Sequence, residues 1–122
     1  MRALHAFLPL ACSLRIPAPG RVVAVGDVHG DVIAFRSTLR ACALIDDAER
    51  WVGGDAVLVQ CGDVLDRGTA EAECLALLRG LVDEARDAGG RVVRLLGNHE
   101  AVRPRGYSFD KSHAAAGTRI FL

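Results

Sequence analysis

Residues 56–68 read AVLVQCGDVLDRG, an apolar run that changes abruptly into glycines, aspartates and an arginine. The same change occurs twice more, where residues 21–30 read RVVAVGDVHG and residues 92–100 read VVRLLGNHE. Each apolar run is short and rich in β-branched residues, which predicts a strand. Three polar runs, at 26–30, 62–68 and 97–100, therefore each follow the carboxyl end of a predicted strand.

Two helical patterns separate the predicted strands, which we place at 21–25, 56–61 and 92–96. The first helix is expected over 32–44 after a cap at Asp31, and the second from a cap at Thr69 to about residue 88. Apolar residues recur on one face of each helix: Val32, Phe35, Leu39, Cys42 and Ala43 in the first, and Ala72, Leu75, Leu78, Val82 and Ala85 in the second.

The order β-α-β-α-β predicts an α/β fold whose parallel strands are joined by right-handed crossovers. The strand at 21–25 is apolar without alternation, so we expect it to be covered on both faces.

Composition excludes several classes of function. The chain has 122 residues, enough for one domain, and a formal net charge of zero, so it has no basic footprint for nucleic acid. It has no run of about 18 apolar residues, so no membrane span is expected. The four cysteines form no Cys-x-x-Cys pair. Buried, reduced thiols are expected, which favours a reducing, intracellular compartment.

Residues 1–20 differ from the rest of the chain because they contain no Asp or Glu and end in Pro17-Ala18-Pro19-Gly20. We expect an N-terminal arm or a targeting segment here, with an apolar stretch that His5 and Pro9 interrupt. Residues 21–122 contain all of the predicted strands and helices.

Asp27, Asp63 and Asn98 mark the three polar runs at intervals of 36 and 35 residues. Each interval holds one crossover, so parallel strands should bring all three to one edge of the sheet, where open α/β sheets bind ligands. His29 lies two residues beyond Asp27, so one turn can direct both side chains at the same ion. Carboxylates and imidazoles suit Mn, Fe or Zn, and the two oxygens of Asp63 can bridge two ions.

The charges of such a site suit a phosphate ester. Two divalent ions bring four positive charges, of which Asp27 and Asp63 cancel two, and the remainder matches a phosphate dianion. Arg67 can hold a phosphate oxygen through its planar guanidinium. His99 can protonate the leaving oxygen, and Asp66 can orient His99.

The motifs GDVHG, GDVLDRG and GNHE resemble the three N-terminal motifs of the calcineurin-like metallophosphoesterases, in their phosphoprotein phosphatase branch. The resemblance covers residues 21 to about 100. The run VLVQCGDVLDRG and the Leu96 before Gly97 are most similar to the Shewanella-like protein phosphatases, some of which are found in plastids. The resemblance implies part of a four-layer α/β/β/α sandwich, in which two sheets pack face to face between helices.

The resemblance also implies two divalent metal ions, Mn, Fe or Zn, and a set of ligands. Asp27 and His29 would bind the first metal, and Asp63 would bridge both. Asn98 would bind the second metal and contact the substrate.

The remaining motif residues take part in catalysis by the same resemblance. His99 would be the general acid, paired with Asp66, and Arg67 would bind the substrate phosphate. Glu100 would have a structural role, or would contact the metal ligands without binding a metal itself.

Further metal-binding histidines and a second phosphate-binding arginine come from the C-terminal half of the family's domain, whereas 22 residues follow Glu100 here. We therefore expect residues 21–122 to be the N-terminal part of a longer catalytic domain. The expected properties of such a part are weak binding of the second metal, little turnover, and an exposed sheet edge through which copies could associate.

Several functions stay open at this point. The first is a phosphatase acting on phosphoserine or phosphothreonine proteins or on small phosphoesters. The second is a dinucleoside polyphosphate hydrolase, and the third is a non-catalytic product that binds metal or a partner. A plain α/β domain with turns and caps at these positions would bind no metal.

Overall fold

The structure is a computed structural model of the chain, and it describes residues 20–102. Expectations for residues 1–19 and 103–122, including the targeting segment, lie outside the described residues. The elements in chain order are β1 (Val22–Val25), α1 (Val32–Ala41), β2 (Val57–Gln60), α2 (Glu71–Asp87), β3 (Arg91–Arg94) and α3 (Asn98–Val102). This confirms the predicted β-α-β-α-β order and adds a short helix after it.

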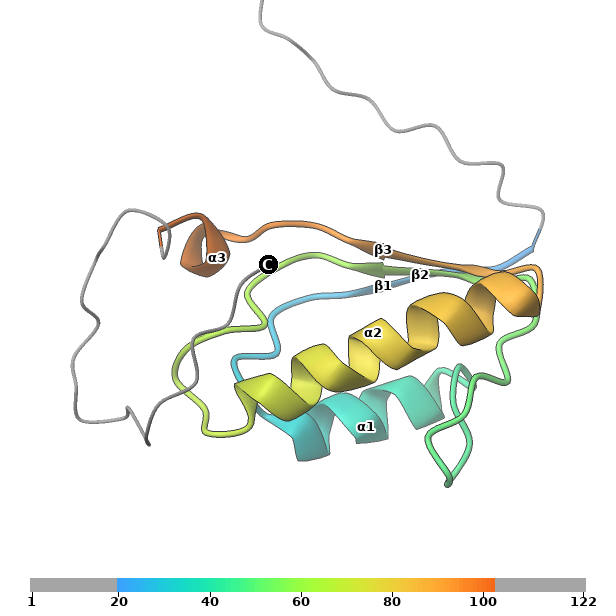
Figure 1. The fold of residues 1–122 in the computed structure, drawn as a ribbon, viewed down its shortest axis with the longest axis horizontal. Helices are drawn as coiled ribbons and strands as arrows, with labels where there is room; N and C mark the ends of the chain where they lie inside the picture. The colour runs from blue at the N-terminus through green and yellow to red at the C-terminus, as the bar shows by residue number, and fades with distance from the viewer. Residues whose placement is uncertain (1–19, 103–122) are drawn as a thin grey trace, which may run out of the picture.

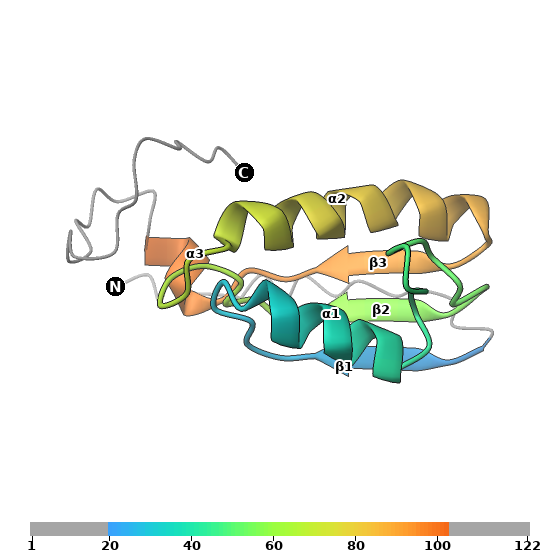
Figure 2. The same cartoon turned by 90° about the horizontal axis from the view of Figure 1, so that it is seen from below.

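The three strands form one parallel sheet in the order β1-β2-β3. Val25, Gln60 and Arg94 are neighbours in the register at its carboxyl end. Both long helices cover the same face of the sheet (Figure 1; Figure 2). Right-handed crossovers that step across a sheet twice in one direction place both connections on one side, which explains this arrangement.

The core lies between the helices and the sheet. Phe35 and Leu39 of α1, Leu78 of α2 and Leu58 of β2 are each at most 2% exposed. Full burial of such a side chain stabilises the fold by about 1.5–3 kcal/mol. This one apolar layer therefore holds the loops at the ends of the strands in place.

The buried faces of the helices differ in part from the predicted ones. α1 ends at Ala41 because Ala43 adopts a left-handed conformation, with φ of 48°. Consequently Cys42 is half-buried and Ala43 is exposed. In α2 the expectation was wrong for Ala72, which is exposed, and for Val82, which is half-buried. The buried residues of α2 are Cys74, Leu75, Leu78, Leu81 and Ala85.

The other face of the sheet is not covered by residues 20–102. Val23 packs against the core, so its neighbours Val22 and Ala24 point away from it, and both are exposed, Val22 by 54%. The expectation that β1 is covered on both faces is therefore not met in the described part of the chain. The register extends this face across β2 and β3, where Ala24 lines up with Val59 and Val93.

The cysteines only partly match the expectation of buried thiols. Cys74 is buried, Cys42 is half-buried and Cys61 is exposed, and all three are free thiols. The expectation was wrong for Cys61 because β2 ends one residue before it, at Gln60. Cys12 lies outside the described residues. Within residues 20–102, no helix is long and apolar enough to cross a bilayer.

Candidate metal and phosphate site

Three loops at the carboxyl end of the sheet meet at Asp63. From the first loop, the backbone N–H groups of Val28 and His29 donate to the Asp63 carbonyl oxygen at 3.0 and 2.9 Å. From the third loop, the His99 N–H donates to Asp63 Oδ1 at 3.0 Å. The three polar runs are therefore brought together at one edge of the sheet, as the parallel order predicts.

Two glycines permit this close approach. A Cβ on Gly62, where φ is 97°, would lie 2.2 Å from the backbone nitrogen of Gly97. A Cβ on Gly97 would lie 2.1 Å from Asp63 Oδ1. Any side chain at these positions would push the second and third loops apart.

The Glu100 carboxylate joins the second and third loops through hydrogen bonds to their backbone. Its Oε2 accepts from the backbone N–H groups of Asp63 and Gly97, at 2.7 and 2.8 Å. Its Oε1 accepts from those of Val64 and Leu65, at 2.8 and 3.1 Å. Glu100 is 4% exposed, so these four bonds form away from water. We call this arrangement the Glu100 brace.

Four site residues adopt the left-handed backbone conformation that usually requires glycine. Their φ angles are 49° for His29, 55° for Asp63, 66° for Asp66 and 69° for Arg67. For such residues this conformation costs about 1–2 kcal/mol each. Such strained backbone conformations persist only where surrounding contacts hold them in place, and they are most frequent at functional sites.

His29 is oriented by a carbonyl group. Its Nδ1 lies 2.9 Å from the oxygen of Leu65, which can only accept, so Nδ1 carries a proton, and in the neutral form of the ring the lone pair is on Nε2. Asp27 Oδ2 lies 3.5 Å from that Nε2. The Nε2 lone pair of a neutral His29 and the Asp27 carboxylate together suit a cation, and a carbonyl on Nδ1 is a typical support for a metal-binding imidazole.

His29, Asp63 and His99 form a group of candidate metal ligands. One ligand atom from each lies within 4.8 Å of the others, and the two imidazole rings meet edge to face with centroids 4.8 Å apart. Two imidazole nitrogens and a carboxylate fit a first-row transition metal. The set implied by the resemblance shares His29 and Asp63 with this group but has Asp27, whose side chain is 65% exposed, where the structure places His99.

His99 and Asp66 are in contact, as the sequence predicts. His99 Nδ1 lies 2.9 Å from Asp66 Oδ2, and the two side chains are 12% and 9% exposed. A carboxylate on Nδ1 fixes the ring and leaves Nε2 to act on a substrate.

Arg67 and Asn98 lie at the rim of this edge. Both residues are exposed, and Asn98 begins α3 directly after Gly97. Among residues 20–102 no carboxylate lies within ion-pair distance of Arg67. Its guanidinium therefore remains available to an anion.

The sequence interpretation missed one buried amide that ties the loops together. Gln60 is 1% exposed and ends β2. Its amide donates to the carbonyl oxygens of Gly62 at 2.7 Å and Gly26 at 3.3 Å, and it accepts from the Gly62 N–H at 2.9 Å. A polar residue at the end of the apolar run VLVQ was the available signal, because a buried amide requires partners.

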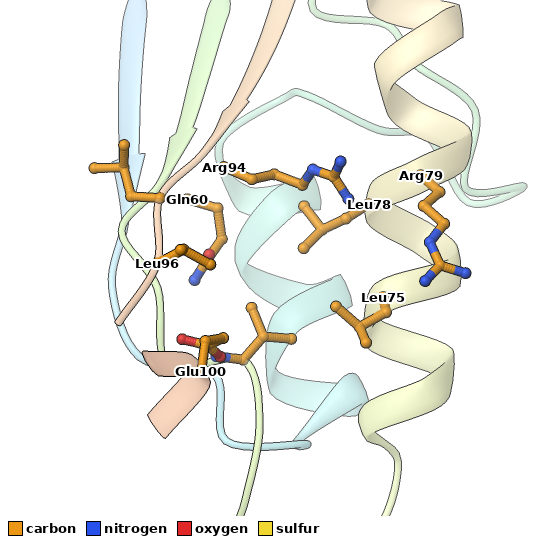
Figure 3. A pocket seen from close by; sticks show the side chains of 9 residues that line it. Gln60, Leu75, Leu78, Arg79, Arg94, Leu96 and Glu100 are labelled. Carbon is orange, nitrogen blue, oxygen red and sulfur yellow. The ribbon is translucent and has the colours of Figure 1, made fainter. Parts of the chain in front are cut away.

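A separate pocket lies behind the Glu100 brace, between the end of β3 and α2 (Figure 3). Its volume is about 480 Å³. Leu75 and Leu78 of α2 line one side, and the side chain of Arg94 extends across it. Of the predicted site residues only Glu100 reaches this pocket, so it is distinct from the ligand group around Asp63.

The chain belongs to the calcineurin-like phosphoesterase family, whose sequence model matches residues 20–120. This confirms the family predicted from the three motifs. That family is one of hydrolytic enzymes that use divalent metals.

Its sequence relatives include Shewanella-like protein phosphatase 2 of Arabidopsis thaliana, 45% identical over 92 residues, or 75% of this chain and 24% of the relative. Shewanella-like protein phosphatase 1 of Plasmodium berghei is 39% identical over 88 residues, or 72% of this chain and 24% of the relative. The chain thus spans about a quarter of the length of these relatives.

Solved structures give the same result for the fold. A cold-active protein-tyrosine phosphatase from a psychrophilic Shewanella species matches 66% of this chain and 24% of its own, with a TM-score of 0.64 and 41% identity. A mutant of a cold-active protein tyrosine phosphatase matches 77% of this chain and 28% of its own, with a TM-score of 0.69 and 37% identity.

Proposed function

We propose that this chain is the metal-binding part of a phosphatase that hydrolyses phosphate monoesters on proteins. The observation that supports this most directly is the convergence of three loops on Asp63, which brings nitrogens of His29 and His99 to within 4.8 Å of its carboxylate. Membership of the calcineurin-like phosphoesterase family supports the reaction class. The similarity to named protein phosphatases supports a phosphoprotein substrate.

Asp27, His29 and Asp63 would hold the first divalent metal ion, and Asp63 and Asn98 the second. Divalent ions held there would supply Lewis acidity toward the phosphate and the attacking water. The chain's own contribution is to bring these oxygen and nitrogen ligands from three loops to one edge of the sheet.

Arg67 and His99 would act on the substrate itself. The exposed Arg67 guanidinium would hold a phosphate oxygen through two parallel N–H bonds. His99 Nε2 would give its proton to the leaving oxygen while Nδ1–H stays on Asp66. The Asp66 carboxylate stabilises the protonated ring before the transfer and keeps it oriented.

The substrate side chain is the finer part of the proposal. The motif resemblance favours phosphoserine and phosphothreonine, whereas the matching solved structures are named protein tyrosine phosphatases. Phosphopeptides of the three kinds, assayed beside diadenosine tetraphosphate, separate the protein phosphatase from the dinucleoside polyphosphate hydrolase.

The test of the proposal is manganese-dependent release of p-nitrophenol from p-nitrophenyl phosphate. Asp63→Asn keeps an oxygen for the His99 N–H but removes the charge, and it should lower the rate by about 100-fold. The matched control is Asp83→Asn, on the exposed surface of α2, which should leave the rate unchanged. Measurable rates that are equal for both variants would contradict the proposal. Manganese binding that Asp63→Asn abolishes, without any release of p-nitrophenol, would indicate a non-catalytic metal-binding product instead.

A further inference from the structure

The turn at Asp66 and Arg67 needs support from outside itself. Both residues are left-handed, with φ of 66° and 69°, and the Gly68 N–H closes the turn on the Asp66 carbonyl oxygen at 2.9 Å. Two consecutive non-glycine residues in this conformation are held only where neighbouring groups fix them. This turn carries both the partner of His99 and the proposed phosphate-binding arginine.

Glu71 supplies a contact of the required kind. It is the first residue of α2, and its Oε1 accepts from the backbone N–H of Asp66 at 2.5 Å. The side chain is half-buried, and its stem lies against the first loop, where a Cβ on Gly30 would be 3.2 Å from Glu71 Cγ. Glu71 therefore touches both the Asp66 turn and the loop that carries His29.

We infer that Glu71 is a positioning residue, which holds the Asp66 turn so that Asp66 orients His99 and Arg67 faces the phosphate. The inference deepens the proposed function and rests on it for the roles of those residues. None of the three motifs includes Glu71, so motif matching does not find it. The chain of contacts is continuous, from Glu71 Oε1 to Asp66 N, and from Asp66 Oδ2 to His99 Nδ1 at 2.9 Å.

Three substitutions separate the hydrogen bond from other effects of this side chain. Glu71→Gln keeps an oxygen acceptor at the same reach without the charge. Glu71→Ala removes the acceptor, and Glu71→Asp shortens the side chain by one methylene. The matched control is Glu73→Ala, on the same turn of α2, whose side chain is 61% exposed and 3.7 Å from Arg36.

The readout is amide hydrogen exchange of the whole chain by ¹⁵N NMR, which requires no bound metal and no turnover. Glu71→Ala should speed exchange at the Asp66 amide by at least about tenfold, since a hydrogen bond to a charged acceptor is lost. Glu71→Gln should stay within about threefold of wild type, and Glu73→Ala should match wild type. The ring ¹⁵N signals of His99 should move toward a mixture of tautomers in Glu71→Ala and remain in the Nδ1–H form in Glu71→Gln.

An unchanged Asp66 amide in a folded Glu71→Ala variant would overturn the inference. If that variant does not fold, Glu71→Asp decides: faster exchange at Asp66 supports the inference and unchanged exchange overturns it. Failure of the proposed function is distinguishable from failure of this inference. A chain without manganese-dependent hydrolysis would still show whether Glu71→Ala changes exchange at the Asp66 amide and the tautomer of His99. In an active preparation, Glu71→Ala should lower kcat by about tenfold and leave manganese affinity within about twofold.

Discussion

Replacing Glu100 with glutamine changes one buried oxygen into an NH₂ group and leaves the size of the side chain almost unaltered. In the wild-type chain both oxygens accept two backbone N–H groups each. The single oxygen of a glutamine can keep two of these four bonds. Its amide nitrogen would face the other two N–H groups, donor against donor.

The loss of stability follows from those two orphaned donors. A buried N–H without an acceptor costs about 1–3 kcal/mol, so the pair should cost about 2–6 kcal/mol. A domain of this size is stable by about 5–15 kcal/mol. Glu100→Gln should therefore remove a large part of the free energy of unfolding, although it adds no bulk and creates no cavity.

Urea unfolding followed by circular dichroism measures this change as a lower midpoint at a similar slope. The control is Glu73→Gln, which alters an exposed carboxylate on α2 and should shift the free energy by less than about 1 kcal/mol. A free energy of unfolding for Glu100→Gln within about 0.5 kcal/mol of wild type would refute the reasoning, because the Glu100 brace would then contribute nothing measurable to stability.

Three further predictions concern other positions. Gly68→Ala should destabilise the chain by more than about 2 kcal/mol in the same urea assay, because its Cβ would lie 2.2 Å from the backbone carbonyl oxygen of His29. The control is Gly80→Ala on α2, where a Cβ meets open space and should stabilise the chain slightly. Burial raises the pKa of the Cys74 thiol from 9.0 to about 11, so the thiol ionises at lower pH in the unfolded chain than in the folded one. The free energy of unfolding should therefore fall as pH rises from 9.0 to about 11, and an unchanged free energy over this range would contradict the prediction. The hydrogen bond from the Trp51 N–H lowers the pKa of Glu84 below 4.5. Glu84→Gln should therefore lower the free energy of unfolding near neutral pH, and this loss should disappear as pH falls below 4.5 through the folded pKa. A loss of the same size at every pH would contradict the prediction.

The arrangement of the candidate site follows from the sequence because of parallel strand order. The β-α-β-α-β pattern fixes which ends of the strands meet, and the register of Val25, Gln60 and Arg94 agrees with it. A residue that follows a strand by only a few positions must then lie in the loop at that end of the sheet. Asp63, which lies three residues beyond Gln60, is placed correctly for this reason.

Contacts between loops could not be predicted in the same way. Thr69 was expected to cap α2, but the N-cap is Ala70 and no side chain caps it. Glu71 instead reaches back to the Asp66 N–H, a bond that depends on how the turn before it is folded. The Gln60 amide likewise bridges segments whose approach is set by backbone geometry rather than by residue type.

The coverage of the sheet could not be predicted either. A continuous apolar strand predicts two covered faces, yet within residues 20–102 the face that carries Val22 and Ala24 is open. What covers a face depends on elements far along the chain, and the local sequence of a strand does not contain them.

Isothermal titration of the purified chain with Mn²⁺ tests the central claim most directly, because it asks whether the loops around Asp63 form a metal site. We predict one tight ion per chain, with further ions bound only weakly, and no binding heat in Asp63→Asn beside a normal titration of Asp83→Asn. Two tight ions per chain would contradict the predicted weak second site. Absence of saturable binding in the wild-type chain, or binding that survives in Asp63→Asn, would contradict the metal site itself.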